Sequence, residues 1–166
     1  SMVANGMADG LVAGAATSTS DVIRAAIRMV GVKPNSKCVS SIFFMVSPDG
    51  EKAITYSDCG VIPEPTSEQL VAIAKDASEF HEILSGESPK VAFLSFSTKG
   101  SANHYRVKRV TDAVKTFSNK HGHICHDGEL QFDAAVDEIV ASRKVPNSPL
   151  GGNSNVMIFP NLDAGN

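Results

Sequence analysis

Apolar positions along the chain follow two different spacings in turn. In some segments they return every three or four residues, which predicts an amphipathic helix, and in others they form short continuous or alternating runs, which indicate strands. Predicted helices span about 20–30, 66–86, 104–120 and 131–143. Predicted strands span 9–15, 38–46, 52–59, 90–96, 123–127 and 155–159.

The order of these segments predicts the fold class. Ser47-Pro48-Asp49-Gly50 is a strong turn sequence between the runs 38–46 and 52–59, which indicates an antiparallel hairpin. From 66 onward, helices and strands alternate, as they do around parallel sheets. We therefore predict one α/β domain over residues 1–166, with a mainly parallel sheet flanked by helices and one antiparallel hairpin.

Charge and composition exclude several classes of protein. The net charge of -3 argues against a surface that binds nucleic acid. Hydrophobic residues make up 42% of the sequence, but no apolar run is long enough to span a membrane. The N-terminus lacks a secretory signal pattern, so we expect a cytoplasmic protein. Its 3 cysteines are an odd number without CxxC spacing, which favours reduced thiols over disulfides or structural zinc.

The start of the first predicted helix is a candidate anion site. Thr17, Ser18 and Ser20 offer hydroxyl groups beside free backbone N–H groups, and Arg24 follows one turn after Ser20. Such N–H donors, together with the helix dipole and a guanidinium group, bind phosphate. The alternative is a simple helix cap with a solvated arginine, and spacing alone favours that alternative.

A second candidate loop follows the predicted strand 90–96. Ser97, Thr98, Lys99, Gly100 and Ser101 place hydroxyl groups, a lysine and a flexible glycine in a row, as in a phosphate-binding loop. The lysine precedes the glycine and the upstream glycine is missing, so this is not a Walker A loop. An ordinary strand-to-helix turn fits the same residues equally well.

Other groupings favour structural roles. His121, His123, His126 and Cys125 would not share one face of a strand, which favours an exposed polar segment over a metal site. We interpret Cys59 as a packing residue, because no base is adjacent to it in the sequence. The carboxylates of 127–133 fit turn hydrogen bonds or substrate hydroxyl groups, and spacing does not decide between these.

The helix 104–120 is strongly basic. We interpret its cations as a solvated face, with contact to a nucleotide phosphate as the alternative. They are Arg106, Lys108, Arg109, Lys115 and Lys120.

Several blocks of the sequence together resemble one enzyme family. The blocks ADGLVAGA, SDVIRAA, SDC…PEPT, FLSFSTKGSA, DGELQFDAA, NSPLGG and FPNLDAGN resemble, in this order, blocks of phosphate acetyltransferases. The match covers nearly the whole chain. The resemblance implies reversible transfer of an acetyl group between acetyl phosphate and coenzyme A, with phosphate as the other product. It implies no metal and no bound prosthetic group, with coenzyme A acting as a substrate.

The resemblance also implies an architecture. Family members have two α/β lobes of the isocitrate/isopropylmalate dehydrogenase-like fold and act as homodimers, and this chain resembles a central segment. The serine, arginine and aspartate of the family's catalytic loop would follow beyond Asn166. No catalytic residue is therefore expected within residues 1–166, and we expect the chain to be inactive alone.

Substrate-binding residues follow from the same resemblance. Arg24 matches the family arginine that binds the phosphate or the coenzyme A end, although Ala25 replaces the usual proline. Matching binding positions are Thr17, Ser18, Ser20, Ser97, Thr98, Lys99, Gly100, Ser101, Asp163 and Asn166. The alternative to an enzyme segment is a stand-alone module that senses an acyl phosphate, a nucleotide or coenzyme A.

Overall fold

The computed structural model describes residues 1–34, 36 and 38–166. Contacts between residues divide the chain into two compact units, residues 1–36 and residues 37–166. The first unit contains helix α1 (Thr19–Met29), which confirms the helix predicted at 20–30. Ser18 is its N-cap, and Gly31 beyond its end has a φ of 91°, the left-handed conformation that favours glycine.

The strand predicted at residues 9–15 is wrong. These residues are irregular, and the side chains of Leu11 and Val12 are 71% and 101% exposed. A strand needs a neighbouring strand to pair its backbone groups, and the described residues of the first unit contain none. The glycines and alanines of this run also have few side-chain atoms to pack on a sheet.

The described part of the second unit is built around a five-stranded sheet. Its strands are β1 (Phe43–Val46), β2 (Ala53–Ser57), β3 (Lys90–Leu94), β4 (Cys125–Leu130) and β5 (Val156–Ile158). The order across the sheet is β1-β2-β5-β3-β4, with β1 antiparallel to β2 and all other neighbours parallel. The predicted mainly parallel sheet with one antiparallel hairpin is confirmed.

The hairpin strands are shorter than the runs 38–46 and 52–59. Ser41 explains one end, because its backbone N–H donates to Asp58 Oδ1 at 3.0 Å and its carbonyl accepts from the Ser57 hydroxyl at 2.7 Å. Side chains therefore take the backbone groups that would otherwise extend the ladder. β4 also begins and ends later than the predicted 123–127.

Two long helices agree with the predictions. Helix α2 (Ser67–Ser85) begins with a reciprocal capping box between Thr66 and Gln69 and ends at Gly86, whose φ is 73°. Helix α3 (Tyr105–His121) begins and ends one residue later than the predicted 104–120, with His104 as its N-cap. Within the described residues, no helix combines the length and the apolar character that crossing a membrane requires.

The single helix predicted at 131–143 is wrong. The structure has two short helices, α4 (Phe132–Val136) and α5 (Glu138–Lys144), separated by Asp137 in an extended conformation. The Asp137 carboxylate caps α5 by accepting from the N–H groups of Ile139 and Val140 at 2.8 and 2.9 Å. The apolar spacing continues through this segment and therefore predicted one helix, but the N-cap at Asp137 begins a second one.

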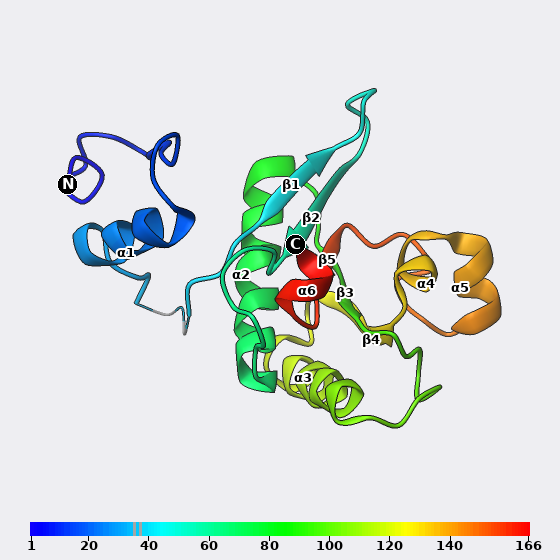
Figure 1. Cartoon of the computed structure of the whole chain (residues 1–166). Coiled ribbons are helices and arrows are strands. Elements are labelled where there is room, and N and C mark those ends of the chain that lie inside the picture. Colours follow the sequence, from blue (N-terminus) through cyan, green and yellow to red (C-terminus); the bar gives the residue numbers. More distant parts are fainter. Residues whose placement is uncertain (35, 37) are drawn as a thin grey trace. The chain divides into compact units, whose positions relative to one another are not determined.

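The second unit has three layers (Figure 1). Because side chains alternate along a strand, Val91 and Phe93 of β3 face α2 and α3, while Ala92 and Leu94 face α4 and α5. Each face has its own buried cluster: the first includes Phe117 of α3, and the second includes Leu130 with the alanines of α4. Helices therefore cover both faces of the sheet, and the loops that follow the parallel strands lie at the carboxyl ends of those strands.

Candidate functional site

The carboxyl ends of the parallel strands β2, β5, β3 and β4 lie at one edge of the sheet, which we call the carboxyl edge. Ligands of open α/β sheets bind beyond this edge. The loop 97–101 follows β3, and the last residues, 159–166, follow β5. The predicted residues Asp163 and Asn166 therefore share an edge with the predicted loop.

The loop 97–101 is folded around one buried carboxylate. Glu129 is a residue of β4 and is 2% exposed. Its carboxylate accepts from the Ser97 hydroxyl at 2.8 Å and from the Gly100 N–H at 2.7 Å. The Ser97 hydroxyl also accepts from the Ala102 N–H at 3.1 Å. Ser101 accepts from the Thr98 N–H at 3.0 Å. Loop donors that a phosphate would use are thus bonded within the protein.

Lys99 pairs with β4 as well. Its ammonium group forms an ion pair with Asp127 and donates to the Gly128 carbonyl at 3.0 Å, although the lysine side chain is 44% exposed. Lys99 and Gly100 both have positive φ, 47° and 83°, which turns the chain sharply here. The carboxylates of Asp127 and Glu129 thus bind the lysine and the donors of this loop, so it is not a free cationic cradle.

Asp58 organises the loop after β2. Its carboxylate accepts from the Ser41 hydroxyl at 2.5 Å and from the N–H groups of Gly60 and Ile62 at 3.0 and 2.7 Å. Burial alone would raise the pKa of Asp58, but these hydrogen bonds outweigh it and hold the pKa below the usual range. The aspartate is therefore a structural anion. This role was not predicted from the sequence, because it depends on the way the loop after β2 folds back on Asp58 and on Ser41, which is 17 residues away.

The residues after β5 pack onto that same loop. The Asn166 side chain donates to the Cys59 carbonyl at 2.8 Å, and the Leu162 N–H donates to the Pro63 carbonyl at 3.0 Å. At Gly165 an added Cβ would lie 2.5 Å from the Asp58 carbonyl oxygen, so only glycine fits there. Asp163, in helix α6 (Leu162–Gly165), stays exposed. Asn166 is thus held in place, whereas Asp163 is accessible to a ligand.

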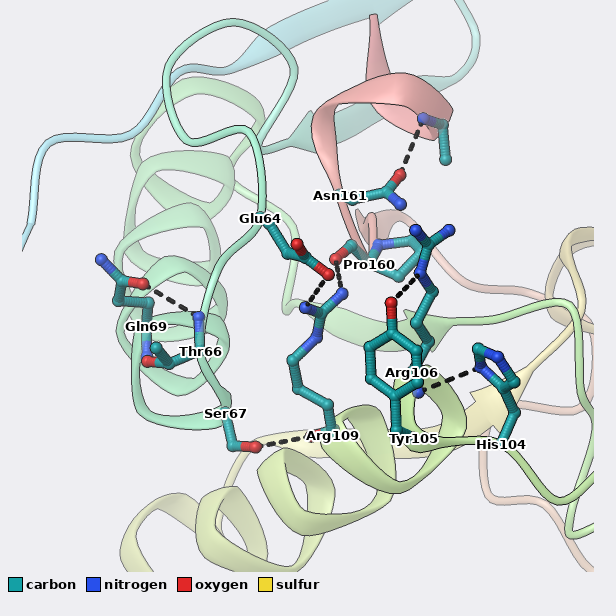
Figure 2. A network of polar contacts seen from close by, with 11 residues as sticks. Glu64, Thr66, Ser67, Gln69, His104, Tyr105, Arg106, Arg109, Pro160 and Asn161 are labelled. Atoms are coloured by element: carbon teal, nitrogen blue, oxygen red, sulfur yellow. Dashed lines mark hydrogen bonds and ion pairs between the residues drawn. The ribbon is translucent and has the colours of Figure 1, made fainter.

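Arg109 joins three segments of the carboxyl edge (Figure 2). Its guanidinium donates to Glu64 Oε1 at 2.9 Å and to the Pro160 carbonyl at 3.0 Å, and its side chain is only 13% exposed. The Ser67 hydroxyl donates to the Arg109 carbonyl at 2.9 Å. The prediction of a solvated basic face on α3 is wrong for this residue. It holds for Lys108, which pairs with Asp112 while 74% exposed.

The helix start in the first unit forms a local polar cluster. The Ser18 hydroxyl donates to Asp21 Oδ2 at 2.7 Å and lies 2.9 Å from the Ser20 hydroxyl. Arg24 donates to Asp21 Oδ1 at 2.9 Å, and its side chain is 59% exposed. Thr17 is exposed beside this cluster. The arrangement is a helix cap with an accessible arginine, and a bound anion would compete with Asp21 for the guanidinium.

An apolar hollow of about 650 Å³ also lies in the first unit. Leu11, Val22 and Met29 are among the side chains that line it. No residue of α1 is buried within the described structure.

Histidine and cysteine side chains have structural contacts. The His126 ring bonds to the Ser118 hydroxyl at 2.6 Å and to the Ile124 carbonyl at 2.7 Å. Among the described residues, no three potential ligands from His, Cys, Asp and Glu are grouped so as to hold a metal ion. Cys59 is fully buried, and burial, followed by the Asp58 charge, raises the pKa of its thiol to about 11. That thiol is unsuited to act as a nucleophile near neutral pH.

Comparison with known proteins gives a consistent result. A family model described as phosphate acetyl/butaryl transferase matches residues 1–166. A curated phosphate acetyltransferase from Thermoanaerobacterium thermosaccharolyticum is 46% identical over 169 residues, which cover 99% of this chain and 52% of the relative. The chain therefore spans about half the length of the curated relatives it matches first.

Solved structures agree. The EutD phosphotransacetylase from Staphylococcus aureus is 44% identical with a TM-score of 0.86, and the match covers 99% of this chain and 50% of that one. A phosphotransacetylase from Streptococcus pyogenes is 38% identical with a TM-score of 0.90, again covering 99% and 50%.

Proposed function

We propose that this chain, which belongs to the phosphate acetyl/butaryl transferase family, is part of a phosphate acetyltransferase that moves an acetyl group between acetyl phosphate and coenzyme A. The observation that carries the proposal is the match over the whole chain, at 46% identity, to a relative of that name. The match to the family model covers residues 1–166, so it includes all the blocks on which the resemblance was based.

The proposed reaction is a direct acyl transfer. The coenzyme A thiolate attacks the acetyl carbonyl, the C–S bond forms, the bond from the carbonyl carbon to the phosphate oxygen breaks, and phosphate leaves. The thiol proton passes to a general base. No metal or bound prosthetic group is required by these steps. We propose that the catalytic serine, arginine and aspartate lie outside residues 1–166, so that this chain alone binds weakly and does not turn over.

Within residues 1–166 we propose binding roles. Arg24, 59% exposed, would grip the phosphate group, with the hydroxyl groups of Thr17, Ser18 and Ser20 beside it. The exposed Asp163 supplies a polar group at the carboxyl edge. Residues 97–101 would line that edge in the conformation that their hydrogen bonds to Glu129 and the ion pair of Lys99 with Asp127 support.

Further proposals concern the whole enzyme. We propose a cytoplasmic homodimer whose two lobes have the isocitrate/isopropylmalate dehydrogenase-like fold, with residues 1–166 inside one α/β domain. The alternative of a stand-alone sensing module has less support, because the relatives described above are named as acyl-transferring enzymes.

An activity assay tests the function. The full-length parent enzyme is incubated with acetyl phosphate and coenzyme A, and thioester formation is followed by absorbance. Turnover by the parent and none by residues 1–166 is the expected result. A parent that forms no thioester contradicts the proposed function, and robust turnover by residues 1–166 contradicts the proposed location of the catalytic residues.

A further inference from the structure

Three exposed rings adjoin one another at the carboxyl edge, and we call Phe96, His104 and Tyr105 the ring platform. The ring centroids of Phe96 and His104 are 5.8 Å apart at an interplanar angle of 66°, and those of His104 and Tyr105 are 4.6 Å apart at 37°. Phe96 is 57% exposed and Tyr105 is 61% exposed. The two outer rings therefore leave more than half of their surface open to a ligand.

Hydrogen bonds position two of the three rings, His104 and Tyr105, before any ligand arrives. His104 is the N-cap of α3, and its Nδ1 accepts from the Arg106 N–H at 3.3 Å. The Arg106 Nε donates to the Tyr105 hydroxyl at 3.1 Å, and its guanidinium carbon lies 5.7 Å from the centre of that ring. Figure 2 shows both hydrogen bonds. Preorganised rings lose little side-chain entropy when they bind.

The platform also lies where ligands of this fold bind. Phe96 directly precedes the loop 97–101, and Tyr105 is one helical turn before Arg109, which ties α3 to Pro160 after β5. The platform is thus fixed to the strand ends rather than to a loose surface segment.

A carboxylate near the platform can accept a hydrogen bond from a bound base. The hydrogen bond to Tyr105 is the main cause that raises the pKa of Arg106, and the charges of Glu64 and Asp163 add to it. Glu64 is already paired with Arg109, whereas Asp163 is exposed. A carboxylate such as that of Asp163 accepts from an exocyclic amino group, and flat rings bind flat heteroaromatic bases by stacking.

We propose that the ring platform binds the adenine ring of coenzyme A, with the base in contact with both outer rings, Phe96 and Tyr105. The inference rests on the proposed function, since it assigns one end of the proposed substrate to a surface of this chain.

A substrate without adenine tests the proposal in the full-length enzyme. Phe96→Ala and Tyr105→Ala are compared with wild type in acetyl transfer from acetyl phosphate to coenzyme A and to pantetheine 4′-phosphate, which lacks the adenosine part. Each variant should raise the KM for coenzyme A about tenfold to a hundredfold, with kcat little changed. The KM for pantetheine 4′-phosphate should stay at the wild-type value.

Control variants separate stacking from folding. Phe80→Ala removes an exposed ring of α2 that is 43% exposed, and it should leave both KM values unchanged. Tyr105→Phe keeps the ring and should retain most of the affinity for coenzyme A. Equal rises in KM for both substrates would indicate a structural effect and overturn the proposal, as would an unchanged KM for coenzyme A.

The inference and the proposed function fail differently. Wild-type enzyme that forms no thioester with either substrate contradicts the proposed function and, with it, this assignment. Wild-type enzyme that is active, with variants that lose no affinity for coenzyme A in calorimetry, contradicts the ring platform alone. Competition by adenosine monophosphate that disappears in Tyr105→Ala would support binding through the base.

Discussion

Arg109 donates a 2.9 Å hydrogen bond to Glu64 from a position 45 residues later in the chain. The same guanidinium reaches the Pro160 carbonyl, which lies 51 residues further on. One side chain therefore joins the loop before α2, the start of α3 and the end of β5. The carboxyl edge owes part of its shape to this single long-range contact.

Replacement of that side chain should destabilise the second unit. Arg109→Ala leaves the Pro160 carbonyl without this donor and opens a gap where a side chain 13% exposed had packed. Hydrogen bonds to charged groups contribute about 1.5–3 kcal/mol each, so we expect a loss of about that size in the free energy of unfolding. Urea denaturation measures it. Lys108→Ala, whose ion pair is exposed, is the control and should cost less than about 1 kcal/mol. Equal losses in both variants would mean that Arg109 does not tie the edge together.

The loop 97–101 should loosen when its buried acceptor is removed. Glu129→Ala leaves the Ser97 hydroxyl and the Gly100 N–H without their partner. An unsatisfied buried group costs about 1–3 kcal/mol. If the free energy of opening this loop falls by that amount, the amide of Gly100 should exchange about tenfold to a hundredfold faster. Hydrogen exchange followed by NMR measures this rate. Glu138→Ala removes an exposed carboxylate that pairs with Asn153, and Gly100 should exchange there as in wild type. Unchanged exchange in Glu129→Ala would contradict the role of the carboxylate.

Local signals explain what the sequence could predict. The helix α2 is bounded by Thr66, Gln69 and Gly86, whose capping contacts reach only a few residues, and these were visible in the sequence. The hairpin turn at 47–50 is local in the same way. The role of Arg109 was not visible, because both partners of its guanidinium are distant in the chain.

Long-range pairing explains the other differences as well. The run 9–15 has an apolar composition suited to a strand, but composition does not supply a neighbouring strand. Glu129 lies in β4, the parallel neighbour of β3, and its carboxylate accepts from donors of the loop 97–101. The contact between Glu129 and this loop could have been predicted by comparing the residues that follow the predicted strands 90–96 and 123–127. The carboxyl ends of parallel neighbours lie at the same edge of a sheet.

The stability of the chain should fall as the pH drops below about 6.5. His81 is fully buried, and its Nδ1 lies 2.9 Å from the Thr55 hydroxyl. Its Nε2 has no hydrogen-bond partner among the residues that the structure describes. Burial lowers the pKa of His81 in the folded state, so the unfolded state binds the proton more readily. Its contribution to stability is complete above the unfolded pKa of about 6.5 and is lost as the pH falls toward the folded pKa.

Denaturation at a series of pH values tests this. Between pH 7.5 and 5.5 the free energy of unfolding should decrease, and His81→Asn should flatten the slope by up to about 1.4 kcal/mol per pH unit. His121, whose pKa is lowered mainly by burial, contributes in the same direction and keeps part of the slope in the variant. His123→Gln, at an exposed position, is the control. A slope that is identical in wild type and His81→Asn would refute the prediction.

The proposed phosphate contact predicts a kinetic effect of Arg24 in the full-length enzyme. Arg24→Ala should raise the KM for acetyl phosphate or coenzyme A, because it removes a charge-assisted contact that contributes roughly 1.5–3 kcal/mol, or about tenfold to a hundredfold in binding. In the structure Asp21 holds this guanidinium at 2.9 Å, so a substrate phosphate must replace that carboxylate. Asp21→Asn should therefore lower the same KM. Arg28→Ala, also exposed and one turn further along α1, is the matched control and should change neither constant. If Arg24→Ala and Arg28→Ala behave alike for both substrates, the guanidinium of Arg24 is only part of a helix cap.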